Sequence, residues 1–292
     1  MKGGTKAVYL GCPAWSVREW RGTFLPEGTP SRDFLPLYSK VFRSVEANST
    51  FYSLPTREVA ERWAREVRRG FRFCFKVPRQ ITHEGTLHAD GAAREEFLDF
   101  LAIFAEEQVL GATFLQVHDS FGPKRLSELA AFLERWPRVF PLAVEVRHCS
   151  FFEGNREEEE LNGMLREAGA GRVLFDSRAL YHAPADDPVE AVSQTRKPRL
   201  PVRWETMRDQ PVTFLRFVGR NRIAQADPWL AEVAREAAGW MRRGSEPYLF
   251  MHAPDDGMAP ALCGRFHAAL RKELPEVEDL DLDGAKDQLE LF

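Results

Sequence analysis

Short apolar runs alternate with segments of helical periodicity along most of the chain. The run at residues 71–78 is dominated by aromatic and apolar side chains, whereas residues 92–108 place Phe97, Leu101 and Phe104 on one helical face. The runs that we predict as strands are residues 7–10, 41–45, 71–78, 112–117, 142–148, 172–175, 212–218 and 248–252. The segments that we predict as helices are residues 31–40, 56–69, 92–108, 126–136, 156–168, 228–243 and 258–274.

This alternation predicts an α/β fold with a parallel sheet that helices cover on both faces. Eight strand–helix units in about 250 residues match a (β/α)8 TIM barrel. The main alternative is a doubly wound open sheet, but the first strand-to-helix turn lacks the G-x-G-x-x-G phosphate loop. We therefore predict a single TIM-barrel domain over residues 1–274 and a short flexible tail over residues 275–292. Residues 179–209 contain scattered prolines and are predicted to be an extended excursion from the barrel.

Composition and charge narrow the classes of function. With 292 residues, of which 44% are hydrophobic, the chain can bury a large core. Its formal net charge of −4 argues against extensive non-specific binding along nucleic acid. The cysteines form no Cys-x-x-Cys pair, the first residues lack a secretory signal, and no apolar stretch is long enough to span a bilayer. We therefore expect a cytoplasmic protein that does not associate with membranes.

Polar side chains stand at the ends of most of the predicted strands. Glu46 and Asn48 follow the second strand and are two residues apart, so on a strand both side chains point to the same face. In a TIM barrel the carboxyl ends of the strands form the mouth where chemistry occurs. The other strand-end candidates are Lys76, Gln116, His118, Glu145, Arg147, Asp176, Arg216 and His252.

The residue types at this mouth indicate an anionic substrate and acid–base chemistry. Lys76, Arg147 and Arg216 would favour a phosphate or a carboxylate. Burial and neighbouring charge would set the pKa of a general base. The candidates for that role are Glu46, Glu145 and Asp176.

Two other interpretations of these residues stay open. The first is purely structural, with buried ion pairs such as Glu145 with Arg216 closing the top of the barrel. The second is a divalent-metal site in which His118 and His252 act with the carboxylates, although no His-x-x-x-His or comparable spacing supports it.

Aromatic side chains accompany the polar ones on the first two strand-to-helix loops. Trp15 and Tyr52, with Trp20 and Phe51 nearby, would form a stacking wall for a base or a sugar ring, whereas any one of them alone suits ordinary packing. His83, on the third loop, would add a hydrogen bond to the substrate.

Several stretches together resemble the YecE-like family, a group of TIM barrels known as domain of unknown function seventy-two. The stretches are residues 11–26 (GCPAWSVREWRGTFLP), 45–55 (VEANSTFYSLP), 71–83 (FRFCFKVPRQITH), 144–151 (VEVRHCSF) and 214–220 (FLRFVGR). The resemblance covers residues 7–272 and implies the barrel fold more strongly than any reaction. The site that it implies contains Trp15, Glu46, Asn48, Lys76, Glu145, Arg147, Asp176 and Arg216.

The chain departs from the family pattern at two places. The family usually has Pro-Pro after the fourth strand, where this chain has His118-Asp119, and it often has paired asparagines on the eighth, where this chain has His252-Ala253. Both departures lie at the mouth, where they bear on substrate and chemistry.

The C-terminus carries a second resemblance. After the acidic residues 280–287, the sequence Gln288-Leu289-Glu290-Leu291-Phe292 is similar to the peptide with which bacterial replication and repair proteins bind the sliding clamp. A solvated tether would present Leu289, Leu291 and Phe292 to a pocket while Gln288 makes hydrogen bonds at its rim. The alternative is that this segment folds back onto the barrel.

Three functional hypotheses follow. The leading one is phosphodiester hydrolysis on a phosphate-containing substrate, a nucleic acid or a nucleotide, by an enzyme that the sliding clamp brings to DNA. The second is a small-molecule lyase or isomerase of a phosphorylated or acidic sugar. The third is a non-catalytic adaptor that binds nucleic acid or a protein.

Overall fold

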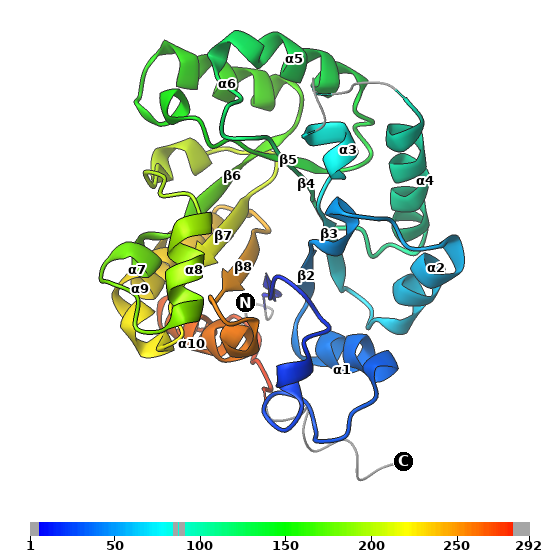
Figure 1. The fold of residues 1–292 in the computed structure, drawn as a ribbon, viewed down its shortest axis with the longest axis vertical. Helices are drawn as coiled ribbons and strands as arrows, with labels where there is room; N and C mark the ends of the chain where they lie inside the picture. Colours follow the sequence, from blue (N-terminus) through cyan, green and yellow to red (C-terminus); the bar gives the residue numbers. More distant parts are fainter. Residues whose placement is uncertain (1–5, 84–86, 88–90, 283–292) are drawn as a thin grey trace, which may run out of the picture.

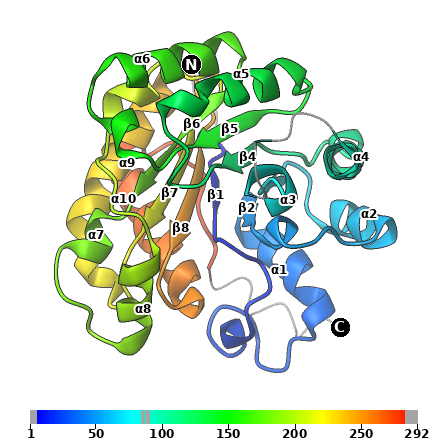
Figure 2. The ribbon, with the colours of Figure 1, turned by 45° about the horizontal axis from the view of Figure 1, so that its top comes forward.

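The computed structural model describes residues 6–83, 87 and 91–282 (Figures 1 and 2). Its described residues form eight short strands, β1 (Tyr9–Gly11), β2 (Ser44–Ala47), β3 (Arg72–Phe75), β4 (Thr113–Gln116), β5 (Leu142–Glu145), β6 (Gly171–Asp176), β7 (Phe214–Val218) and β8 (Tyr248–His252). The α-helices of the same residues are α1 (Phe34–Val41), α2 (Arg57–Glu66), α3 (Arg79–Thr82), α4 (Ala92–Glu106), α5 (Leu126–Arg135), α6 (Arg156–Glu167), α7 (Arg178–Tyr181), α8 (Pro188–Arg196), α9 (Asp227–Arg242) and α10 (Ala259–Glu273). The helices lie outside the strands (Figure 1).

The strands divide into two parallel sheets. Six of them form a half-barrel in the order β1-β8-β7-β6-β5-β4, and β2 pairs with β3 in a separate two-stranded sheet. The prediction of an α/β fold with parallel strands is therefore confirmed, but the prediction of a closed eight-stranded TIM barrel is wrong, because no continuous ladder joins the two sheets within the described residues.

A tyrosine side chain explains the break between β1 and β2. The Cys12 backbone N–H donates to the Tyr38 hydroxyl at 2.8 Å, and that hydroxyl donates to the Ser44 carbonyl, also at 2.8 Å. The phenol therefore takes the place of a direct ladder bond. A direct backbone bond follows only beyond it, from the Glu46 N–H to the Cys12 carbonyl at 3.0 Å, and Pro13 has no N–H with which to continue.

Isolated bridges replace a ladder between β3 and β4. Phe73 is bridged to Leu110, which precedes β4, and Lys76 to Phe114, which lies within it. Between these points Gly111 approaches β3 so closely that a Cβ there would lie 2.8 Å from the Cys74 sulfur. The strands are thus neighbours without an uninterrupted hydrogen-bonded register.

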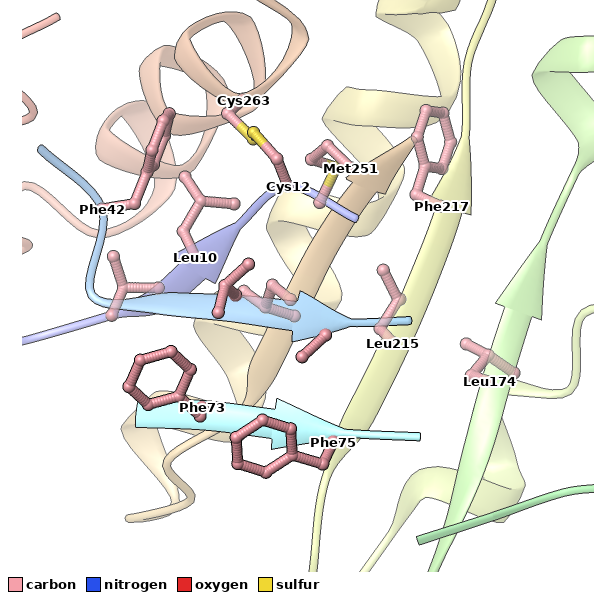
Figure 3. Close-up of a cluster of buried hydrophobic side chains, with 14 of the residues drawn as sticks. Leu10, Cys12, Phe42, Phe73, Phe75, Leu174, Leu215, Phe217, Met251 and Cys263 are labelled. Carbon is pink, nitrogen blue, oxygen red and sulfur yellow. The ribbon is translucent and has the colours of Figure 1, made fainter. Parts of the chain in front are cut away.

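The core lies between the strands and the surrounding helices. Side chains such as Leu10, Phe73, Phe75 and Leu215 are almost completely buried in it (Figure 3). Figure 3 also shows Cys12 beside Cys263, and their sulfurs are 3.6 Å apart as free thiols.

Most predicted elements lie within a few residues of their observed positions. The second strand begins later than predicted, because Val41 is the last residue of α1 and β2 starts at Ser44. The prediction that residues 179–209 form an extended excursion is wrong over much of its length, since α8 occupies its middle. Asp187 caps α8 by accepting hydrogen bonds from the Val189 and Glu190 N–H groups, and Pro188 supplies the preset φ of the first turn.

The C-terminal residues that the structure describes lie against the rest of the chain. Val277 is buried, and Lys6 is bridged to it in parallel orientation. The clamp-like peptide Gln288–Phe292 lies outside the described residues, so its binding and the predicted boundary at residue 274 stay predictions. In the part of the chain that the structure describes, no helix has both the length and the apolar character needed to cross a membrane.

Candidate functional site

A cavity of about 880 Å³ opens at the carboxyl ends of the strands. Strand ends and the loops after them contribute Pro13, Ala14, Trp15, Ser16, Asn48, Ser49, Phe51, Tyr52, Lys76, His83, Gln116, Arg147, Arg216, His252, Ala253, Pro254 and Asp256 to its lining. The remaining lining residues are Val189, Val192, Ser193, Arg196 and Lys197, which belong to α8 and its C-terminal end. The cavity therefore lies where the sequence predicted a site, and α8 forms a wall that was not predicted.

Arg216, on β7, is the centre of the polar network beneath this cavity. Its guanidinium binds Glu46 in a bidentate pair, with Nε 2.9 Å from Oε2 and Nη2 2.7 Å from Oε1. Its remaining nitrogen, Nη1, donates to Glu145 Oε2. Both carboxylates are fully buried, so this arginine joins the two-stranded sheet to the six-stranded one through a charge-assisted contact.

The two carboxylates around Arg216 are held in their ionised form. Burial alone would raise the pKa of Glu46, but the charge of Arg216 and the contact with His252 outweigh it and place that pKa well below its ordinary value. Burial likewise opposes ionisation of Glu145, yet Arg216 and Arg147 lower its pKa to about 2. The structural interpretation, a buried Glu145–Arg216 pair, is thus present in the structure.

Glu46 has further polar partners at the cavity floor. Asn48 Nδ2 donates to Glu46 Oε1 at 2.7 Å and also to the Pro13 carbonyl at 3.1 Å. His252 Nε2 lies 3.0 Å from Glu46 Oε2. Because an ionised carboxylate only accepts, His252 must carry its proton on Nε2, while its burial lowers its pKa. Every oxygen of Glu46 is therefore engaged.

Arg147 extends the network from β5 into the cavity. Its Nε and Nη2 lie 2.7 and 2.6 Å from Glu145 Oε1, and its side chain is 19% exposed. One edge of the guanidinium is therefore held by Glu145, while the side chain lines the cavity. This geometry suits a cation that meets an anionic ligand.

Lys76, directly after β3, is a buried cation that has no carboxylate partner among the described residues. Its Nζ donates to Gln116 Oε1 at 2.9 Å and lies 4.1 Å from the centroid of the Phe51 ring. No carboxylate of the described residues forms an ion pair with it. Burial and then the charge of Arg216 lower the pKa of Lys76 to about 7, so a large fraction of the amine is neutral near physiological pH.

Three of the four aromatic residues predicted as a stacking wall line the cavity beside His83, namely Trp15, Phe51 and Tyr52. Trp20 does not: it is fully buried and stacks on Tyr38. Trp15 packs edge-on against Trp63, whereas Tyr52 is 73% exposed at the rim. His83 packs edge-on against Phe51, with Nδ1 2.6 Å from Thr82 Oγ1. Burial and the nearby Lys76 lower the pKa of His83 to about 4, which leaves the ring neutral at physiological pH.

Asp176 and His118 do not line this cavity, although the His118 ring packs edge-on against His83, which does. Asp176 is fully buried, but its oxygens accept hydrogen bonds from Arg178, which in turn contacts Glu232 on α9. His118 is exposed and contacts Ser120. Neither is among the described lining residues. Of the two metal-ligand candidates only His252 reaches the cavity, and the described residues contain no group of three or more His, Cys, Asp or Glu side chains arranged to hold a metal ion.

The sequence interpretation missed the cations of α8 and its end. Lys197 is half-buried, and its amine makes no ion pair within the described chain. Burial and Arg216 lower the pKa of Lys197. The sequence signal that predicts α8 is Asp187-Pro188, because Asp is a typical N-cap residue and Pro is typical of the first turn of a helix. A buried ion pair of Glu190 with Arg220 fixes the helix to the loop after β7.

Comparisons with known proteins identify a matching family model and relatives of the chain. The family model described as "Protein of unknown function DUF72" matches residues 9–286. The chain is 36% identical over 271 residues to the UPF0759 protein YecE of Escherichia coli (strain K12), which covers 92% of this chain and 95% of that protein. It is 25% identical over 229 residues to the UPF0759 protein YunF of Bacillus subtilis (strain 168), covering 76% of this chain and 73% of that protein.

Solved structures share the fold. A DUF72 family protein from Thermotoga maritima aligns with a TM-score of 0.68 at 24% identity, over 92% of this chain and 100% of that one. A DUF72 family protein from Enterococcus faecalis aligns with a TM-score of 0.67 at 20% identity, over 90% of this chain and 95% of that one.

Proposed function

The chain belongs to the DUF72 family of proteins of unknown function, and from this premise we propose that it is an enzyme acting on a small anionic substrate. The resemblance of the sequence to the YecE-like family is thereby confirmed. The substrate would bind in the cavity through a phosphate or carboxylate, and the reaction would be a proton transfer of the lyase or isomerase class on a phosphorylated or acidic sugar.

The charge of the cavity lining carries this proposal. Among the described lining residues one carboxylate, Asp256, stands against the cationic side chains Lys76, Arg147, Arg196, Lys197 and Arg216. Glu46 and Glu145 compensate Arg216 and part of Arg147 from below. Lys197 and the remaining edge of Arg147 are left for the anionic group of a ligand, and a cavity of about 880 Å³ has the size of a small-molecule site.

The state of the acid–base groups favours proton transfer by the lysine over proton transfer by the carboxylates. The oxygens of Glu46 and Glu145 are occupied by arginines, which holds both groups ionised. Lys76, whose pKa is lowered to about 7, can both accept and donate a proton near neutrality. The roles predicted for these residues are therefore redistributed: the carboxylates position cations, and Lys76 is the acid–base group.

Deuterium exchange tests the proposal directly. Purified full-length protein is incubated in D₂O with phosphorylated and acidic sugars, and loss of C–H proton signals next to their carbonyl groups is followed by NMR. We expect exchange with at least one sugar, its loss in Lys76→Met, and its retention in Lys124→Met, which changes an exposed lysine. A protein that binds none of the anionic compounds by calorimetry would overturn the proposal.

Phosphodiester hydrolysis with recruitment by the sliding clamp is a second candidate, and it is supported by sequence alone. The observation that favours it is the C-terminal sequence Gln288-Leu289-Glu290-Leu291-Phe292. Binding of the full-length chain to purified clamp, compared with a chain lacking residues 288–292, tests it. Loss of binding on truncation would place nucleic acid among the substrates to be assayed, and equal or absent binding in both would remove this candidate.

A further inference from the structure

Lys76 differs in its surroundings from the arginines beside it. Arg216 and Arg147 each bind a carboxylate at ion-pair distance. Among the described residues, the Lys76 amine contacts only the neutral amide oxygen of Gln116, at 2.9 Å, and the face of Phe51, although Lys76 is only 9% exposed. Burying an ammonium group without a counter-charge is unfavourable. A lysine that served only to stabilise the fold would gain from a carboxylate partner.

These surroundings are those of an activated amine. Withdrawal from water and neighbouring cations, here Arg216 and Arg147, are the two conditions that turn a lysine into a nucleophile. Gln116 accepts one N–H of the amine and so fixes the orientation of the nitrogen. The cavity beside Lys76 would hold the electrophile.

We propose that Lys76 is a nucleophile that forms an imine with a carbonyl group of the anionic substrate. This inference rests on the proposed function, because the substrate must enter the same cavity. It narrows the substrate class to aldehydes or ketones that also carry a phosphate or a carboxylate. Arg147 and Lys197, which line the same cavity, would bind that anionic group.

The step is balanced without an oxidant or a reductant. The lone pair of the Lys76 nitrogen attacks the carbonyl carbon and forms a C–N bond, while the carbonyl π electrons move to the oxygen, which takes up a proton. The nitrogen loses its two protons in turn, and the oxygen takes up a second one. The nitrogen lone pair then forms the second C–N bond as the C–O bond breaks, and the oxygen leaves as water. The product is an imine whose protonated form is a cation, and the Phe51 face 4.1 Å from the amine nitrogen would stabilise that charge.

Reductive trapping tests the proposal, with pyridoxal 5′-phosphate as a probe because it combines an aldehyde with a phosphate. The full-length protein is mixed with the probe, reduced with borohydride and digested, and the modified lysines are identified by mass spectrometry. We expect at neutral pH about tenfold more label on Lys76 than on the exposed Lys124, and saturation at low probe concentration. Inorganic phosphate should compete with the labelling.

Two variants and one analogue make the outcome decisive. Lys76→Arg keeps a cation in place and should lose the label while it retains binding of pyridoxine 5′-phosphate, which has the phosphate but no aldehyde. Lys197→Met should keep the label on Lys76 and bind both compounds less tightly. Binding of pyridoxine 5′-phosphate without label on Lys76 would overturn the imine but not the proposed anion site. Label spread evenly over exposed lysines, with no binding of either compound, would overturn both.

Discussion

Strands β5 and β6 are neighbours that end in the same pattern, a carboxylate followed two residues later by an arginine. Glu145 pairs with Arg147 at 2.6 Å and Asp176 pairs with Arg178 at 2.8 Å, and both carboxylates are completely buried. Nevertheless Arg147 lines the cavity, whereas Arg178 contacts Glu232 on α9.

The difference lies in the third partner of each pair. Glu145 also accepts a hydrogen bond from Arg216 of β7, so its pair belongs to a network of charges under the cavity. The arginine of the other pair binds Glu232, so that pair fastens a strand end to an outer helix. The same short pattern therefore gives a cavity-lining arginine after one strand and a link to an outer helix after the next, and the third partner of each pair determines which.

The largest expected difference between the two pairs is in stability. Arg216→Met would leave two buried carboxylates without their main partner, and we expect the free energy of unfolding to fall by about 3–5 kcal/mol. Arg178→Met removes a side chain that is 32% exposed and leaves the fully buried Asp176 with the Arg178 backbone N–H, so we expect a smaller loss of about 2 kcal/mol. Urea unfolding measures both. Equal losses would mean that the two networks are equally structural.

The pH dependence of stability gives the next effect, because Lys76 lies on the cavity side. Its folded-state pKa of about 7 is below the ordinary 10.5, so between these values the unfolded chain binds one more proton than the folded one. The free energy of unfolding should therefore rise with pH above about 7, by up to about 1.4 kcal/mol per unit. Below pH 7 both states are protonated and this contribution is constant.

Urea midpoints of wild type and Lys76→Met between pH 6 and pH 10 check this prediction. The rise should be smaller in Lys76→Met, while Lys124→Met should follow wild type. At the acid end, Glu145 gives a slope of the same sign: its pKa of about 2 is below the ordinary 4.5, so its stabilisation is lost as pH falls from about 4.5 towards 2. Parallel curves for wild type and Lys76→Met would show that Lys76 stays charged in the folded protein.

The two pairs also show how far the sequence could predict this site. Residues at strand ends with a polar neighbour two positions away, such as Glu46 with Asn48, were identified because strand geometry puts both on one face. The partner of Arg178 is 54 residues away, and no local pattern reveals it. The break between β1 and β2, which makes the predicted closed barrel wrong, could not be predicted either, because the Tyr38 hydroxyl between them is a contact between a helix and two strands.

Arg147 and Arg178 should also differ in their effect on anion affinity, although this difference is smaller than the effects on stability. Arg147→Met removes a cation that lines the cavity, and we expect the affinity for inorganic phosphate to fall about tenfold, the effect of one charge-assisted hydrogen bond. Arg178→Met should change it by less than about twofold, because that side chain is bound to Asp176 and Glu232. Calorimetric titration at fixed salt compares them. A tenfold loss in Arg178→Met would mean that the anion binds at the other pair.

The smallest expected effect is a gain in phosphate affinity, and it comes from replacing a carboxylate. Glu145→Gln keeps an oxygen that can accept from an arginine, but it removes the negative charge 2.6 Å from Arg147. We expect phosphate to bind about fivefold more tightly, since an ion pair of this kind is worth about 1 kcal/mol. Asp176→Asn should leave the affinity within about twofold of wild type, because Arg178 is directed to α9. Circular dichroism at the titration temperature confirms that both variants are folded. Weaker binding by Glu145→Gln would show that Glu145 acts by positioning Arg147, and that its charge does not oppose the anion.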